Sequence, residues 1–242
     1  MAFASVLRNS LRHRASSVPV ELAEGRTLEE VLNRHLLTVE SLADSVMLTS
    51  ILLLDYEGRR LRHAAAPSLP KLYCDAIDGS EIGPTAGSCG TAAFVGHAIY
   101  VEDIATDPLW ADYHQLALPH GLRACWSTPI RDNHGLLIGT FAVYHPTPRL
   151  PTKEEVQAIG MIADHAAQAI GWFRSSQDLG ESEPLAAGTG DMSSIAADFE
   201  KIVHTIERAI RLFPQADLDA LNRAKRAAER GAKIARNNVE LD

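Results

Sequence analysis

The stretch of sequence that decides the fold is centred on GSCGTAA at positions 87–93. IDG at 77–79 and IGP at 82–84 precede them, and VEDI at 101–104, DPLW at 107–110, GLRACWS at 121–127 and GTFA at 139–142 follow. Closely spaced Gly and Pro residues predict short helices and loops between residues 78 and 120. Within this segment, Asp107 before Pro108 is a typical helix start and predicts a helix over residues 109–118.

Short β-strands are predicted on either side of this segment. Residues 46–54 and 61–66 are rich in β-branched and aliphatic residues and flank a DYEG turn, as in a β-hairpin. Residues 124–131 and 136–144 form a similar pair around the turn DNHG, in which Gly135 suits a left-handed backbone conformation. Two hairpins are therefore expected, one before and one after the Gly- and Pro-rich segment.

Two capping boxes mark the starts of longer helices. TLEE at 27–30 and TKEE at 152–155 each place a Thr hydroxyl and a Glu carboxylate where they satisfy main-chain amides at a helix N-terminus. Apolar residues recur at helical spacing after each box, up to Leu42 and Phe173 respectively. The narrow seam of the second helix suits packing either on another helix or on a sheet of the same domain.

Four regions are expected along the chain. They are an N-terminal arm over residues 1–20, a domain over 21–173, a flexible linker over 174–192 and a helical region over 193–242. The arm is either frayed or a short dimerising helix. The linker is rich in Ser, Gly and Pro. The last region repeats apolar residues at coiled-coil spacing but is marginal as a coiled coil alone, so it is expected to dock on the domain or to pair in a homodimer.

Composition bounds the function classes. The chain has 242 residues, 46% of them hydrophobic and 22% charged, which is ordinary for a globular protein. A net charge of −8 argues against nucleic acid as a partner, and no apolar run reaches the roughly 18 residues of a membrane span. The three cysteines, Cys74, Cys89 and Cys125, are too few and too dispersed for a disulfide framework, so a cytoplasmic location is expected.

The order of the motifs between residues 77 and 149 resembles a bacterial GAF domain, and the resemblance covers residues 22–173. It implies an α+β fold, with about six antiparallel strands in a central sheet flanked by helices, and here a C-terminal helical extension. The ligand of such a domain lies between the sheet and a roof, which would be residues 83–94 and 103–121. The strands around Trp126 and Phe141 would then form the floor. The implied function is non-catalytic sensing of a small molecule or of redox state by a regulatory protein.

Convergent aromatic and polar side chains in this region are candidates for ligand binding. They are Asp103, Trp110, Tyr113, Arg123 and Trp126. Arg123 either binds an anionic ligand in a bidentate manner or pairs with Asp103 or Asp107. The Trp side chains also fit a structural role in a core. If Trp126 lines the pocket, its replacement by Ala is expected to weaken ligand binding.

Cys89 is a further candidate, because a thiol at a helix N-terminus can be reactive. The alternative is a small buried residue in a tight turn, since no resolving cysteine is nearby in the sequence. Cys125 and Trp126 are neighbours on a predicted strand and must point to opposite faces, which favours a core position for Cys125. Cys74 gives no signal.

Enzymatic and cofactor-dependent alternatives are less well supported. The GSCGTA stretch is similar to a cysteine motif of free methionine-(R)-sulfoxide reductases, thiol-dependent enzymes built on this fold. Those enzymes place another cysteine in the loop that corresponds to residues 110–123, and this loop has none. The histidines lack metal-ligand spacing, and no cysteine directly precedes a roof histidine, so metal, haem and bilin are disfavoured. The expected partners are an unidentified small molecule, a second copy of the chain and a signalling protein that contacts the C-terminal helices.

Overall fold

The computed structural model describes residues 2–43 and 45–181, and single positions between 197 and 233. Met1–Gly180 form one compact unit and Glu181–Asp242 another. The helices of the first unit are α1 (Ala2–Ala23), α2 (Leu28–Ser41), α3 (Lys71–Ile77), α4 (Gly87–Val95), α5 (His114–Ala117) and α6 (Lys153–Glu181). Its strands are β1 (Leu48–Leu54), β2 (Arg60–Ala65), β3 (Ser80–Glu81), β4 (Ile99–Val101), β5 (Ala124–Arg131) and β6 (Leu137–His145).

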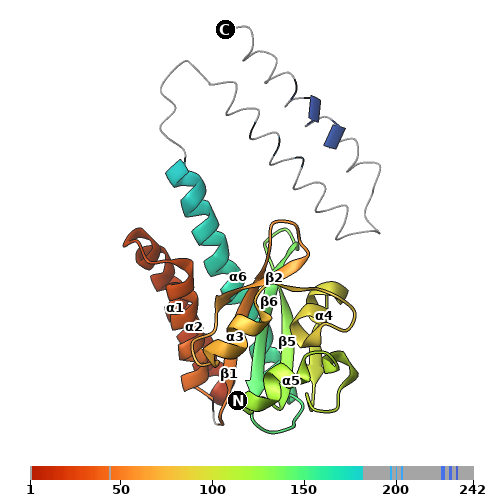
Figure 1. Cartoon of the computed structure of the whole chain (residues 1–242). Coiled ribbons are helices and arrows are strands. Elements are labelled where there is room, and N and C mark those ends of the chain that lie inside the picture. The colour runs from red at the N-terminus through yellow and green to blue at the C-terminus, as the bar shows by residue number, and fades with distance from the viewer. Residues whose placement is uncertain are drawn as a thin grey trace, which may run out of the picture. The chain divides into compact units, whose positions relative to one another are not determined.

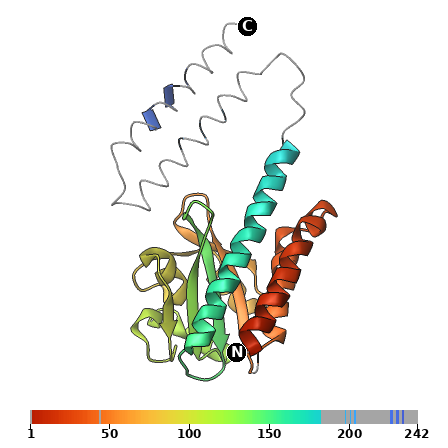
Figure 2. The same cartoon turned by 180° about the vertical axis from the view of Figure 1, so that it is seen from behind.

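The six strands form one antiparallel sheet in the order β3-β2-β1-β6-β5-β4. Helices α3, α4 and α5 cover one side of it, here called the roof face (Figure 1). Helices α1, α2 and α6 cover the other, here called the helix face (Figure 2). Each face has its own cluster of buried apolar side chains. The expected α+β fold with a six-stranded antiparallel sheet is confirmed.

Both predicted hairpins form, with boundaries within two residues of the prediction. β1 pairs with β2 and β5 pairs with β6, and the second turn places Gly135 at φ +79° as expected. The pairing of β1 with β6 joins the two hairpins into one sheet. A Cβ at Gly139 would lie 2.2 Å from the Leu52 carbonyl oxygen, so this junction requires a residue without a side chain.

Helix α1 contributes to the core on the helix face. Leu7, Leu11 and Val18 are at most 1% exposed and belong to the same cluster as residues of α2 and α6. Arg14 and Glu21 form a largely buried ion pair along the helix, with Nη1 2.6 Å from Oε1. Residues 1–20, which the sequence sets apart as an arm, thus supply side chains to the domain core because their apolar residues recur on one side of a helix.

Both predicted capping boxes are present. At α2, the Thr27 hydroxyl accepts from the Glu30 amide, while the Glu30 carboxylate accepts from the Thr27 amide. Thr152 and Glu155 make the same two bonds at α6. Helix α6 continues to Glu181, so the first part of the predicted linker is helical. The rest of the linker and the predicted helical region after residue 193 lie outside the described residues, apart from the single positions named above.

The helix predicted over residues 109–118 is broken into three short pieces. Asp107 caps its start as expected and accepts from the Leu109 amide at 2.9 Å. A 3₁₀ turn (Pro108–Trp110) leads to α5, and Pro119 lies in a further 3₁₀ turn (Leu118–His120) that ends at Gly121, φ +74°. The break falls at residues 111–113, where the Ala111 and Tyr113 amides bond to the carbonyls of Pro108 and Trp110 three residues back, so the chain turns more tightly than an α-helix.

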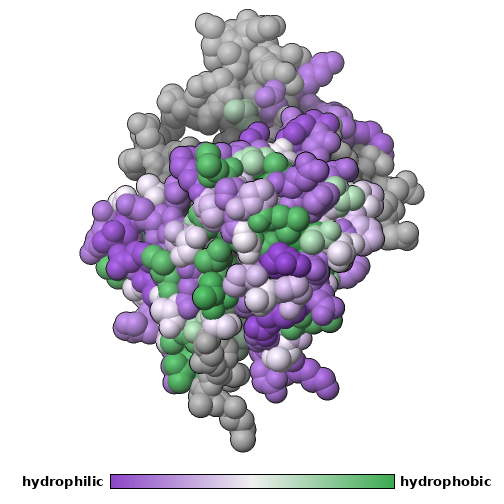
Figure 3. All heavy atoms as spheres, turned by 60° about the horizontal axis from the view of Figure 1, so that its bottom comes forward, coloured by the Kyte–Doolittle hydropathy of each residue, from purple (hydrophilic) through white to green (hydrophobic). Residues whose placement is uncertain are grey.

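The surface of the described part of the chain mixes polar and apolar groups. Figure 3 shows small groups of apolar residues between polar ones on one side of the molecule. Exposed large apolar side chains are dispersed along the sequence, among them Val46, Leu72, Phe94 and Leu150. Among the described helices none combines the length and apolarity that a membrane span requires.

Candidate functional site

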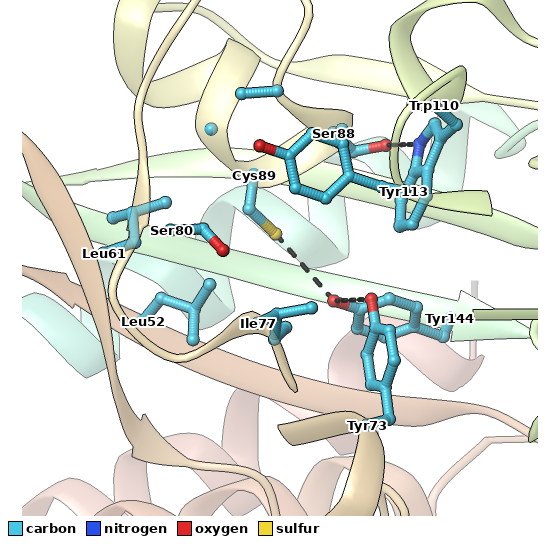
Figure 4. Close-up of a pocket in the computed structure, with 13 residues that line it drawn as sticks. Leu52, Leu61, Tyr73, Ile77, Ser80, Ser88, Cys89, Trp110, Tyr113 and Tyr144 are labelled. Atoms are coloured by element: carbon cyan, nitrogen blue, oxygen red, sulfur yellow. Dashed lines mark hydrogen bonds between the residues drawn. The ribbon is translucent and has the colours of Figure 1, made fainter. Parts of the chain in front are cut away.

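A small cavity of about 40 Å³ lies on the roof face, between the start of α4 and the sheet. Leu52, Leu61 and Tyr144 line it from the strands, Tyr73 and Ile77 from α3, and Trp110 and Tyr113 from the segment before α5 (Figure 4). The N-cap residue Ala86, the first four residues of α4 (87–90) and Ser80 of β3 complete the wall. This volume holds a few water molecules and is far below the roughly 300 Å³ or more of a typical small-ligand site.

The glycines of the GSCG motif allow α4 to begin directly above the sheet. Gly87 has φ +60° and lies against the Trp110 ring, where a Cβ would be 3.6 Å from it. A Cβ at Gly90 would meet the Ala86 Cβ at 2.6 Å and the Glu81 carbonyl oxygen at 3.3 Å. The motif therefore encodes a left-handed backbone position followed by a close approach between chain segments.

A chain of hydrogen bonds ties the roof to the sheet through Ser88. The Trp110 Nε1 donates to the Ser88 hydroxyl at 3.0 Å, and that hydroxyl donates to the main-chain carbonyl of Cys125 at 3.0 Å. The side chains of Trp110 and Ser88 are both buried. Losing either bond would leave a buried polar group poorly satisfied, so these bonds fix the first turn of α4 against β5.

The Cys89 side chain points from α4 toward the sheet, where its sulfur lies 3.9 Å from the Tyr144 hydroxyl (Figure 4). Tyr73 donates from its own hydroxyl to Tyr144 at 3.4 Å. Ser127 and Thr140 are also fully buried, and their hydroxyls make no hydrogen bond within the described structure. The thiol thus faces a floor of hydroxyl groups rather than a purely apolar one.

This environment shifts the pKa values of the two buried thiols, Cys89 and Cys125, in opposite directions. Hydrogen bonding from the Cys125 thiol, opposed by burial and supported by the hydroxyls of Ser127, Tyr144 and Thr140, lowers the pKa of Cys89 to about 7. Burial, reinforced by the neighbouring Cys89, raises the pKa of Cys125 well above its ordinary value. The thiolate form is therefore favoured at Cys89 and disfavoured at Cys125.

Three of the six predicted site residues meet at the cavity: Cys89, Trp110 and Tyr113. Asp103 and Arg123 are close to each other but do not line it. Arg123 Nη2 and Nε donate to the two carboxylate oxygens of Asp103 at 2.9 and 3.1 Å. This hydrogen bonding lowers the pKa of Asp103 and raises that of Arg123. Of the two roles left open for Arg123, the structure shows the ion pair with Asp103.

Trp126 lies on the helix face, so the predicted floor around Trp126 and Phe141 is on the wrong side of the sheet. Both side chains are at most 1% exposed and belong to the core of the helix face. The Trp126 Nε1 donates to the Arg149 carbonyl oxygen at 3.0 Å, and the Arg149 guanidinium lies 5.0 Å from its ring centre. Cys125 points to the roof face, as the strand alternation predicts.

The sequence interpretation missed Tyr73, Ser88 and Tyr144. Tyr144 is opposite Cys125 in the register of β5 and β6 and therefore shares its face. Alternation along the predicted strand was a signal for this residue, but it required knowledge of which face carries the roof. Tyr73 comes from α3, whose position above the sheet no local pattern indicates.

A larger cavity of about 370 Å³ lies on the helix face, with walls from α2, β5, β6 and α6. Trp126, Val143 and His145 form its sheet side, and Arg149 lies at its edge. The Arg149 guanidinium is already paired with Glu155 at 2.7 Å. The described residues contain no group of three or more His, Cys, Asp or Glu side chains that could hold a metal ion.

The GAF domain model matches residues 27–170, which is more than half of the chain. The methyl sulfide methyltransferase-associated sensor of Methanosarcina acetivorans is 36% identical over 162 residues. Those residues are 67% of this chain but only 16% of that protein, so the chain spans a small part of this relative.

Solved structures share the fold. A GAF sensor protein from Burkholderia vietnamiensis superposes with a TM-score of 0.56 at 19% identity, covering 72% of this chain and 99% of that one. The free methionine-R-sulfoxide reductase of Neisseria meningitidis, solved with its substrate, gives a TM-score of 0.54 at 17% identity, covering 72% and 93%. At such identities the likeness concerns the fold alone. Together with the family match and the arrangement of roof, sheet and terminal helices, it shows that the chain belongs to the GAF domain family.

Proposed function

We propose that this chain is a non-catalytic cytoplasmic regulatory protein that senses a small molecule or redox state through the cavity on the roof face. The observation that carries the proposal is the Trp110–Ser88–Cys125 hydrogen-bond chain, which joins roof and sheet beside that cavity. The sensor-named relative and the family support a signalling role. Because the cavity holds only a few water molecules, the sensed species is either very small or enters when the roof moves.

The signal passes through the sheet. β5 carries Cys125 on the roof face and Trp126 on the helix face. The Trp126 side chain bonds to Arg149, in the segment that leads into α6. A change in how α4 lies on β5 therefore alters the support of the terminal helices. A coupling of about 1–3 kcal/mol between the two faces is enough for regulation. In this proposal the chain is a homodimer, and a signalling partner binds its C-terminal helices.

A variant of the roof tests the coupling without knowledge of the ligand. Ser88→Ala removes both hydrogen bonds of the chain, and hydrogen–deuterium exchange then reports on roof and helices separately. We expect faster exchange in α4 and also in α6 and α1. Glu57→Gln, in the exposed turn between β1 and β2, is the control and leaves both regions unchanged. Faster exchange confined to α4 contradicts the coupling.

Native mass spectrometry of the freshly purified full chain addresses the ligand and the subunit count together. We expect a dimer, and a bound small molecule that is lost in Ser88→Ala. A monomer without any added mass, in a protein whose helices also fail to respond to the roof, rejects the sensor proposal.

A thiol-dependent free methionine-(R)-sulfoxide reductase is the second candidate. The observation that favours it is the position of Cys125, which is distant from Cys89 in sequence but lies in the same buried cluster, with its carbonyl bonded to Ser88 beside Cys89. The cavity argues against it, because about 40 Å³ has no room for an amino acid unless the roof opens. Free methionine sulfoxide with thioredoxin, its reductase and NADPH separates the candidates, since only an enzyme oxidises NADPH in a substrate-dependent way.

A further inference from the structure

Two cysteines that are 36 positions apart in the sequence converge beneath the first turn of α4. Cys89 is the third residue of that helix, and Ser88 beside it is bonded to the Cys125 carbonyl. Tyr144, opposite Cys125 on β6, lies against the Cys89 sulfur. Cys89 and Cys125 are thus buried in the same cluster of the roof face, and of the two only Cys89 lines the cavity, while Cys74 is half-buried on α3.

We propose that Cys89 and Cys125 form a peroxide-reactive dithiol, in which a hydroperoxide oxidises Cys89 at the cavity and Cys125 then closes an intramolecular disulfide. This inference deepens the proposed function and rests on it only for its signalling consequence. The cavity reaches the Cys89 side chain and has the size for a molecule of two or three heavy atoms. Hydrogen peroxide is such a molecule, whereas a larger oxidant does not fit this volume.

The unpartnered hydroxyls on the floor are an independent indication. Ser127 and Thr140 are 0% exposed, yet neither hydroxyl has a hydrogen-bond partner in the described structure. Buried hydroxyls without partners are costly and uncommon in native proteins. Neither hydroxyl reaches hydrogen-bond geometry with the Cys89 sulfur, but both face it and lower the pKa of its thiol. A thiolate, or the oxygen of a sulfenate, supplies the acceptor that these two donors lack.

The reaction balances with peroxide as the sole oxidant. The Cys89 thiolate attacks one peroxide oxygen, so that an S–O bond forms, the O–O bond breaks, and the departing hydroxide takes a proton to become water. The Cys125 sulfur, after giving up its proton, attacks the sulfenic sulfur; the S–S bond forms as the S–O bond breaks, and a second water leaves. Two thiols lose two electrons, and one peroxide becomes two waters.

The groups around Cys89 assign the two roles. Those facing it are the Cys125 thiol and Ser127 hydroxyl on β5 and the Thr140 and Tyr144 hydroxyls on β6. Burial keeps the pKa values of Cys125, Tyr144 and Tyr73 well above their ordinary values, so all three stay protonated at neutral pH. Cys89 lines the cavity and Cys125 does not, so Cys89 is the thiol that meets the oxidant and Cys125 the resolving thiol.

The full chain with Cys74→Ser, which keeps only the proposed pair, is the protein for the test. It is treated with hydrogen peroxide, the remaining thiols are alkylated, and the protein is cleaved after Arg and before Asp. These sites separate position 74, Cys89 and Cys125 into different peptides. We expect a cross-linked Cys89–Cys125 peptide that dithiothreitol abolishes. Full alkylation of both cysteines after peroxide treatment overturns the proposal, as does a cross-link between two protomers only.

Variants of the pair distinguish the roles. Cys125→Ser leaves Cys89 as a sulfenic acid that dimedone traps, whereas Cys89→Ser leaves Cys125 fully reduced. Cys125→Ala repeats the first experiment if the buried serine prevents folding, which circular dichroism reports. An unchanged dimedone yield with and without Cys125 rejects its role as the resolving thiol.

The same samples separate this inference from the proposed function. Hydrogen–deuterium exchange of α1, α2 and α6 before and after oxidation reports whether the helices respond. A disulfide without any helix response retains the dithiol and rejects the sensing mechanism. A response to the roof variant Ser88→Ala without a disulfide retains the sensor and rejects the dithiol.

Discussion

The two faces of the sheet are built from alternate residues of the same strands but have different chemistry. On the helix face, Ile51, Trp126 and Phe141 pack under α2 and α6 in an apolar cluster. On the roof face, Cys125, Ser127 and Thr140 place a thiol and two hydroxyls beneath α4. The helix face has the larger cavity, about 370 Å³, and the roof face the smaller, about 40 Å³. The two faces thus differ both in cavity volume and in the polarity of the side chains they present.

The difference shows how one strand divides two tasks. Side chains that point to the helix face supply burial and hold the terminal helices, and those that point to the roof face tune a thiol. Because neighbouring residues of a strand alternate between faces, a change at Cys125 and a change at Trp126 act on different sides through one main chain. The predictions below test whether stability and thiol chemistry separate in this way.

The largest expected effect comes from Trp126→Ala on the helix face. It removes a fully buried ring, its hydrogen bond to the Arg149 carbonyl and its contact with the Arg149 guanidinium. We expect a loss of about 3–5 kcal/mol in the free energy of unfolding, measured in urea. Leu72→Ala, at a position 75% exposed, is the control and costs little. A stable Trp126→Ala protein with an altered Cys89 pKa shows that the ring belongs to the roof site after all.

Acid destabilises the helix face through His35 on α2. The ring is 2% exposed, its Nε2 has no partner in the described structure, and the His165 ring lies 6.3 Å away. Burial, with the nearby His165 and Arg14, lowers its pKa to about 4. Since the unfolded chain then binds more protons between pH 6.5 and 4, stability is lost as the pH falls through this range. The loss from this group amounts to roughly 3 kcal/mol.

Thermal unfolding between pH 7 and 4 measures this effect. His35→Leu is expected to flatten the pH dependence, whereas His134→Gln in the exposed β5–β6 turn leaves it as in the wild type. An equally steep loss in His35→Leu assigns the acid response to other groups, such as His145 or His165, whose pKa values burial also lowers.

A smaller effect separates the two faces through a matched pair of threonines. Thr140 and Thr128 both have buried hydroxyls without a partner in the described structure. Thr140 faces Cys89, whereas Thr128 pairs with Phe141 and lies on the helix face. We expect Thr140→Val to raise the pKa of Cys89 from about 7 toward its ordinary value. An upward shift of one unit slows alkylation at pH 7 about fivefold through the smaller thiolate fraction.

The measurement is the pH profile of iodoacetamide alkylation of Cys89 in a Cys74→Ser background. Thr128→Val is expected to leave the profile unchanged. Neither variant loses a hydrogen bond, so the free energy of unfolding changes little in both. Identical profiles for the two variants mean that the hydroxyl of Thr140 does not support the thiolate.

The smallest effect is expected at the Asp103–Arg123 pair. Both side chains are partly exposed, and solvent screens their attraction. Asp103→Asn therefore leaves the unfolding midpoint almost unchanged and has no effect on the oxidation of Cys89. A clear slowing of Cys89 oxidation in Asp103→Asn would mean that this ion pair, although it does not line the cavity, takes part in the thiol site.

Much of the architecture was predictable because its causes are local. Both capping boxes, the two hairpins and the Asp107 cap depend on residues close together in sequence, and each is present. The helix over 109–118 was wrong in its continuity, since tight i→i+3 turns at residues 108–113 replace its first part. The core role of α1 was not foreseen, because its apolar residues have meaning only against α2 and α6.

The candidate site was predictable in part. The GSCG motif identified Cys89 through its neighbouring glycines, and strand alternation correctly separated Cys125 from Trp126. The choice of Trp126 as floor was wrong because alternation states that two residues differ in face without saying which face the roof covers. The position of Cys125 in the same buried cluster as Cys89 was missed for a related reason, since a search of nearby residues does not reach β5.

The sequence by itself determined the family, the elements and the alternation of side chains along each strand, because these depend on short-range patterns of glycine, caps and apolar residues. Only the tertiary structure decided which side of the sheet lies under α4, and with it that Cys89 meets Cys125, Ser127 and Thr140. The physical reason is that the thiol pKa and the cavity depend on contacts between α4 and the sheet. Those contacts join residues that are far apart along the chain.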